Sequence, residues 1–293
     1  MKSRDSIYNM GNDYPQYVVL RGFAPRPTPT PTPGPEPEPT DPLNPLNLPS
    51  NTVRVRTNDG NAPYKDSNTS YEIATLVEGT TDVYDVYKSG TDFILMFYSS
   101  TNVIEVLGAN TSSVKDMNTM FYGCTSLTSV PLFNTSTVTS MSAMFYGCSS
   151  LTSIPLFDTS SVEYMGGMFY GCTSLTSVPL FNTSTVTSMN TMFRDCASLT
   201  SVPLFDTSSV EYMGSMFRAC ASLTSVPLFN TSSVKDMSYM FTGCIAVEGG
   251  ALALYHEASV KNPQPNHKKT FTDCGKNTAT GAAELIQIPP EWR

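Results

Sequence analysis

Cysteine and methionine are the residues of this chain whose spacing could support chemistry. A seventh cysteine, Cys274, follows six that stand 24 residues apart: Cys124, Cys148, Cys172, Cys196, Cys220 and Cys244. Twelve of the fifteen methionines fall at two fixed positions of the six full repeats. A regular series of sulfur side chains could bind a metal, form disulfides, or fill the inside of a long stack of repeats.

One cysteine per repeat favours the third interpretation. Structural zinc needs four ligands at one point, and each repeat supplies only one. Disulfides between stacked repeats are conceivable, but cysteines in register point the same way, and seven of them leave one unpaired. Free cysteine usually behaves as a small buried apolar residue, and regularly spaced methionines are usually core. We therefore expect reduced, buried sulfur, with no metal and no cofactor.

Few other residues are candidates for catalysis. The two histidines, His256 and His267, lie near the C-terminus outside any recognisable nucleophile or metal motif, and no glycine-rich phosphate loop is present. Asp158 and Glu163 recur with the repeat, which makes capping their simplest role. We predict that the chain is not an enzyme.

The elements that must position these side chains are the repeats themselves. The unit reads V-x-x-M-x-x-M-F-x-x-C-x-S-L-T-S-V-P-L-F, followed by N/D-T-S. The spacing from Val114 to Cys124 predicts one face of a short helix, and Leu127–Phe133 predicts a short strand that ends in a turn. An S-x-x-E capping box recurs before the predicted helices, at Ser160–Glu163 and Ser208–Glu211. This pattern predicts an α/β repeat solenoid of strand-turn-helix coils, stacked about 4.8 Å apart.

The chain is expected to have five parts. Residues 1–22 are interpreted as an anchoring peptide, and residues 23–50 as a Pro/Thr-rich linker that its prolines hold extended. Alternating residues in TVRVRTNDG and TDVYDVYKSG predict a β-rich N-terminal cap at 51–89. Residues 90–244 are the 24-residue repeats, beginning with a worn coil. Residues 245–293 form a degenerate last repeat and C-terminal cap, in which LIQIP resembles the L-T-S-V-P of the unit.

The repeat pattern M-F-x-x-C-x-S-L-T-S-V-P-L-F-D-T-S-S-V resembles the BspA-like leucine-rich repeats of bacterial surface proteins, over about residues 90–293. RVRTNDGNAPYK and TGAAELIQIPPEW are similar to sequences that flank such repeats in proteins of gut bacteria and their phages. The resemblance implies a right-handed leucine-rich-repeat-like stack that serves adhesion or recognition. It supplies no catalytic or binding residues.

Composition excludes several classes of protein. A net charge of −8 argues against binding nucleic acid through counterion release. No apolar run approaches the roughly 18 residues of a membrane span, so we expect no membrane insertion. The N-terminal segment lacks the apolar core of a signal peptide, which predicts a chain that carries no export signal.

These features together predict a phage virion protein, made in the bacterial cytoplasm, such as a head or tail fibre or decoration. Residues 1–22 would dock on a capsid or tail protein, and the solenoid would contact a host surface protein or glycan. If the protein forms a homo-oligomer, we expect a trimer. The alternative is a bacterial cell-surface leucine-rich-repeat adhesin, and an intracellular scaffold is a third interpretation.

Contact residues are expected in the outer columns of the stack, where side chains change from coil to coil. One column reads Tyr122, Tyr146, Tyr170, Arg194, Arg218, Thr242, and another reads Ser140, Tyr164, Ser188, Tyr212. Stacked tyrosine and arginine could bind sugars or proteins through ring faces and planar donors, or could simply cover the coil edges.

A further column alternates amide and acid: Asn134, Asp158, Asn182, Asp206, Asn230. Alternation would separate the carboxylates and let each amide donate to a neighbouring acid. Duplication of a 48-residue block would produce the same pattern without selection.

Overall fold

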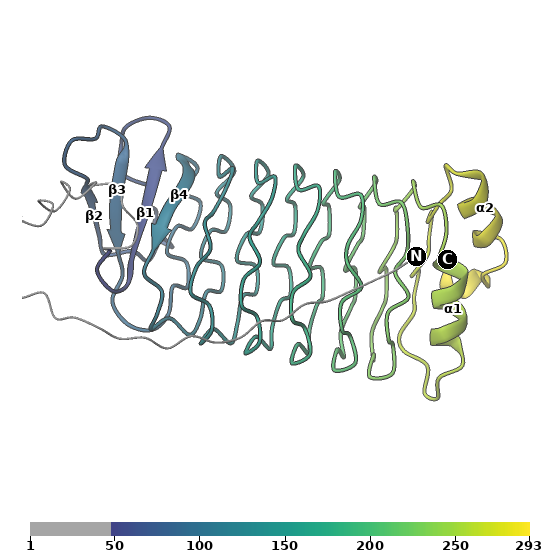
Figure 1. Cartoon of the computed structure of the whole chain (residues 1–293). Helices are drawn as coiled ribbons and strands as arrows, with labels where there is room; N and C mark the ends of the chain where they lie inside the picture. The colour runs from purple at the N-terminus through teal and green to yellow at the C-terminus, as the bar shows by residue number, and fades with distance from the viewer. Residues whose placement is uncertain (1–47) are drawn as a thin grey trace, which may run out of the picture. The chain divides into compact units, whose positions relative to one another are not determined.

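The computed structural model describes residues 48–293, which belong to one compact unit, Asp41–Arg293. They form a repeat solenoid, as the 24-residue period predicts. Figure 1 shows its coils side by side, with a small sheet at one end and two helices at the other. The anchoring peptide and most of the predicted linker lie outside the described residues.

The N-terminal cap is a four-stranded antiparallel sheet with the strand order β2-β3-β1-β4. Alternating valines explain its inner face, since Val53, Val55 and Val86 are fully buried. The outer edge of β4 receives the first full coil, where the Thr128 amide donates to the Ile104 carbonyl at 2.9 Å. The strands are β1 (Thr52–Thr57), β2 (Ile73–Leu76), β3 (Val83–Tyr87) and β4 (Val103–Ala109).

The segment predicted as a helix, from Val114 to Cys124, is instead a run of tight turns, and so are its copies. Alternate amides have different partners. The Cys124 amide donates to Phe121 in its own coil at 3.1 Å, whereas the Phe121 amide donates to Met144 in the next coil at 2.9 Å. Half of the backbone donors in this segment therefore join one coil to the next, which an α-helix would not permit.

Backbone conformation explains why the helix prediction is wrong. Thr119 and Gly123 have φ of 54° and 71°, and the matching positions of the later coils are also left-handed. A right-handed helix cannot contain such residues every fourth position. The capping boxes start no helix either, because Ser160 donates its amide and its hydroxyl to Oδ1 of Asp158 in a local turn.

The strand predicted at Leu127–Phe133 is also absent from the described coils. Only isolated bridges form there, such as Glu105 with Ser129. A continuous parallel ladder, with one bridge between each pair of neighbouring coils, runs instead through another column: Asp92, Asp116, Ser140, Tyr164, Ser188, Tyr212, Asp236 and Asn266. The α/β assignment is thus wrong for the repeats, which are built from turns and bridges.

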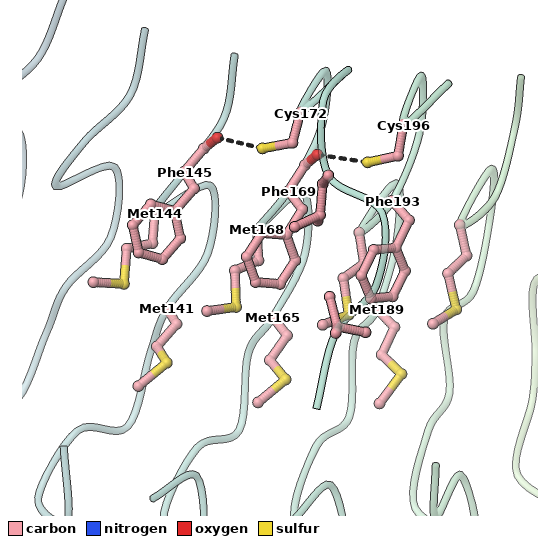
Figure 2. Packing of buried hydrophobic residues seen from close by; sticks show 14 of the residues in the cluster. Met141, Met144, Phe145, Met165, Met168, Phe169, Cys172, Met189, Phe193 and Cys196 are labelled. Atoms are coloured by element: carbon pink, nitrogen blue, oxygen red, sulfur yellow. Dashed lines mark hydrogen bonds between the residues drawn. The ribbon is translucent and has the colours of Figure 1, made fainter. Parts of the chain in front are cut away.

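The core is a set of columns that run the length of the stack. Phenylalanine rings of successive coils stack at centroid distances between 5.2 and 6.0 Å, in the order Phe97, Phe121, Phe145, Phe169, Phe193, Phe217, Phe241 and Phe271. Methionines lie beside them in two further columns (Figure 2). Flexible methionine fills the space left between stacked rings.

A column of buried threonines fastens each coil to the next. The hydroxyl of Thr159 donates to the Asn182 carbonyl at 2.8 Å, and Thr183 donates to Asp206 at 2.7 Å. The last of these residues, Thr231, has no further coil in register and donates instead to Glu257 of α1 at 2.9 Å. A carboxylate from the cap thereby replaces the missing backbone carbonyl.

The C-terminal cap contains α1 (Ala251–Ser259), α2 (Ala279–Leu285) and the short 3-10 helix η2 (Pro290–Trp292). Phe271 and Cys274 return to the repeat register, as the sequence predicts, and Phe271 donates its amide to the Trp292 carbonyl at 2.8 Å. The buried Trp292 ring covers the open end of the phenylalanine column. LIQIP does not imitate the repeat, because its first residue ends α2.

The threonine column supports a test of coil fastening. Replacing the buried Thr183 by valine keeps the shape of the side chain but removes the donor to the Asp206 carbonyl, which should lower the free energy of unfolding by about 0.5–1.5 kcal/mol. Thr176→Val, at an exposed threonine of the same coil, should change it by less than about 0.5 kcal/mol. Equal melting in denaturant of both variants and the parent would contradict the role of the column.

Candidate recognition surface

The sulfur column, the first candidate for chemistry, lies inside the core. All seven cysteines are buried free thiols. Each repeat thiol faces the carbonyl of a phenylalanine in the preceding coil; Cys172 Sγ donates to Phe145 at 3.1 Å and Cys196 Sγ to Phe169 at 3.0 Å (Figure 2). Burial raises the pKa of Cys196 and Cys274 to about 12. Reactive thiols have lowered pKa values and solvent access, so this column is structural.

The histidines form no catalytic arrangement with their neighbours. The His267 ring stacks on Trp292 at a centroid distance of 4.0 Å, which makes it part of the C-terminal cap. His256 is exposed on α1. Within residues 48–293, no group of three or more His, Cys, Asp or Glu side chains could hold a metal ion.

The first predicted contact column is a stack of tyrosines with its ring faces occupied. Ring centroids lie 4.4 Å apart between Tyr122 and Tyr146, and 4.2 Å apart between Tyr146 and Tyr170. Tyr98, from the worn first coil, extends the stack at 4.8 Å. Burial raises the pKa of the Tyr122 and Tyr146 hydroxyls. Only ring edges and hydroxyl groups therefore remain available to a partner.

Arginines continue this column and close it. The Arg194 guanidinium lies over the Tyr170 ring at 5.1 Å and pairs with Asp195, with 3.4 Å between Nε and Oδ2. Arg218 lies over the Tyr239 ring at 5.6 Å. Both side chains are half-buried and engaged with their neighbours. The whole column thus acts chiefly as a covering of the coil edges.

The second predicted column is different, because its two tyrosines are exposed and stack on no other ring among the described residues. Tyr164 and Tyr212 are 48% and 41% exposed, and they lie on the continuous parallel ladder. They are two coils apart, with Ser188 between them. The ammonium group of Lys235 lies over the Tyr212 ring, 5.9 Å from its centroid, and also pairs with Glu211 at 2.7 Å. Two exposed rings about 10 Å apart along a rigid ladder form the better candidate for recognition.

The alternating Asn/Asp column makes local turns. In every second coil an exposed carboxylate, Asp158 or Asp206, accepts from the amide and hydroxyl of the serine two residues later. Asn134 and Asn182 accept from serine in the same way. These serine hydrogen bonds lower the pKa of both carboxylates. No amide of this column donates to a neighbouring carboxylate in the described coils, so the alternation needs another explanation.

One surface feature was missed by reasoning from the sequence alone. Five leucines placed in the predicted strand point outward, with 55–65% of each exposed: Leu132, Leu156, Leu180, Leu204 and Leu228. Phenylalanine follows each leucine and is buried. In extended backbone, neighbouring residues face opposite sides, so the P-L-F triplet was the available signal that one of its two apolar side chains must face solvent. We call these residues the leucine stripe.

A family comparison agrees with the repeat architecture. The chain matches the model of a family described as Mycoplasma protein of unknown function, DUF285, over residues 91–202 and 174–271. These two matches together cover more than half of the chain, which therefore belongs to this family. The recognition of the repeat as a BspA-like leucine-rich repeat is confirmed.

Comparison with solved structures finds a leucine-rich repeat protein from Eubacterium ventriosum, with a TM-score of 0.40 and 24% sequence identity. The match covers 56% of this chain and 39% of that protein, so the chain spans well under half of its length. No curated protein matches. In the described part of the chain, no helix is long and apolar enough to span a membrane.

The sulfur column leads to a titration experiment. Native protein at pH 8.5 should react negligibly with a thiol reagent, and denatured, unreduced protein should yield about seven thiols. Burial raises the pKa of these thiols in the folded protein. Their contribution to the free energy of unfolding is therefore fully present below the ordinary thiol pKa of 9.0, and it is lost as the pH rises toward about 12. Several disulfides, or rapid labelling of the native protein, would contradict this assignment.

Proposed function

We propose that this chain is a non-enzymatic recognition protein that contacts its target along the parallel ladder. The supporting observation is the exposed pair Tyr164 and Tyr212, which stand in a column that changes from coil to coil while the core columns stay constant. An aromatic ring offers a sugar or a protein both apolar area and a hydroxyl. The target is a host surface protein or glycan. The tyrosine–arginine column contributes little beyond tyrosine hydroxyl groups, and its members are Tyr122, Tyr146, Tyr170, Arg194 and Arg218.

The carrier of this surface is, in our proposal, a phage particle. Two features support it: the order of peptide, proline-rich linker and rigid solenoid, and the column of reduced cysteines, which suits folding in the bacterial cytoplasm. Residues 1–22 attach to a capsid or tail protein, and the linker holds the solenoid away from the particle. We also propose that the coils stack with a right-handed sense, as the resemblance implies.

A bacterial cell-surface adhesin is the second candidate. The match to a family described from Mycoplasma favours a bacterial origin. In that case the same ladder would contact a host cell or a neighbouring bacterium, and the N-terminal segment would attach the protein to the producing cell.

The chain itself offers the substitution that tests the ladder. Serine occupies the tyrosine position in alternate coils, so Tyr164→Ser with Tyr212→Ser should preserve the fold and weaken binding to target cells about tenfold or more. Flow cytometry with labelled protein measures the loss. Thr176→Val, at an exposed threonine outside both tyrosine columns, is the control and should bind normally; equal binding by the double variant would refute the ladder as the contact surface.

The attachment proposal has its own experiment. A chain that lacks residues 1–22 should melt at nearly the temperature of the full chain, because residues between Val53 and Trp292 build the described hydrophobic core. In phage-producing cells it should no longer enter particles, as judged by immunoblotting of purified virions. Equal incorporation would overturn the anchor, and recovery of the full chain in the envelope of producing cells would support the adhesin.

A further inference from the structure

The leucine stripe exposes a continuous apolar surface that the recognition ladder does not use. Its five leucines repeat once per coil, about 4.8 Å apart, over five successive coils. A half-buried proline precedes each leucine, and the flanking columns carry exposed threonine, serine, asparagine and aspartate without lysine or arginine. Monomeric proteins rarely expose contiguous apolar patches above a few hundred Å², so the stripe indicates an interface.

We infer that two copies of this chain pair antiparallel through the leucine stripe. A second copy presents apolar side chains with the same axial spacing, so leucines of one copy can face leucines of the other. The face extends about 25 Å along the axis, which approaches the scale of a standard interface of about 800 Å² per partner once the flanking columns are included.

We place the two-fold axis between two coils, at an indentation beside the stripe. This hollow has a volume of about 330 Å³ and is lined by Leu156, Leu180, Asp158 and Asn182, among others. An axis through it brings the same hollow of the second copy opposite, and sets the coil of Leu156 opposite the partner coil of Leu180.

The Asn/Asp column favours this register. An antiparallel two-fold that lies in the interface plane brings each column opposite the same column of the other copy. With the axis between Leu156 and Leu180, Asp158 faces Asn182 and Asn134 faces Asp206. An axis through the coil of Leu180 would bring Asp158 against Asp206, and the carboxylates would repel.

Hydrogen-bonding capacity agrees with this pairing. Oδ1 of Asn182 accepts from Ser184, and its Nδ2 donates to none of the described residues. Oδ1 of Asp158 accepts from Ser160, whereas Oδ2 accepts from none of them. An amide donor and a carboxylate acceptor therefore meet across the interface. Pairing of copies gives the alternation of amide and acid a role that contacts within one chain do not.

The test measures the mass of the full chain by light scattering during size-exclusion chromatography at concentrations on the order of 10 µM. The parent should have twice the chain mass of 31.9 kDa. Leu156→Glu with Leu180→Glu should be monomeric, because the buried carboxylates raise the dissociation constant of the dimer at least about 100-fold. Thr139→Glu with Thr187→Glu, which copies the glutamates of neighbouring coils on the ladder, is the matched control and should stay dimeric.

The register has an independent readout that does not depend on the leucine variants folding. Asn134→Asp, Asn182→Asp and Asn230→Asp together make this column wholly acidic. The first two changes place acid opposite Asp206 and Asp158, and should weaken the dimer at low salt with recovery at high salt. Asp158→Asn with Asp206→Asn should remain dimeric. A monomeric or trimeric parent, leucine variants as dimeric as the control, or an Asn→Asp triple variant that pairs like the parent would each overturn the proposed pairing.

Discussion

Hydrogen bonds between equivalent residues of neighbouring coils are the constraint on which this protein depends. Alternate amides in each run of turns donate to the next coil, so every residue lies beside its counterpart 24 positions later. Identical side chains must then share a column, whether they are phenylalanine rings, thiols or threonine hydroxyls. A ring that stacks well once stacks well in every coil, and a misfit would be repeated as often.

The same register organises the surface. Tyrosines at one column press their faces together from Tyr98 to Tyr170 and become part of the covering, while Tyr164 and Tyr212 are kept apart by serine and remain exposed. A column that repeats tyrosine in successive coils loses its ring faces to stacking. A column that alternates tyrosine with serine does not.

The period, the core columns and the β-rich N-terminal cap could be predicted from the sequence, because each rests on the side-chain pattern. The turns could not, since Met117, Phe121 and Cys124 have the spacing of a helix face whatever backbone carries them. Gly123 hinted at left-handed backbone, but Thr119 adopts the same region without any such signal. The candidate surface was predictable only in part: the tyrosine columns were identified, while the stacking of one column depended on ring distances that no sequence contains. Leu132 was assigned to a strand, and its exposure follows from Phe133 taking the inward position.

Glu257 bears on how the number of coils in this protein can change. Its carboxylate satisfies Thr231 as a backbone carbonyl satisfies every earlier threonine, so the final coil is completed by the cap and not by any particular number of predecessors. Interior coils are therefore interchangeable units. Loss or gain of two coils by recombination between near-identical stretches would preserve both ends, every fastening and the alternation of amide with acid. The length of the solenoid can therefore change between generations in steps of two coils, while each resulting protein still folds.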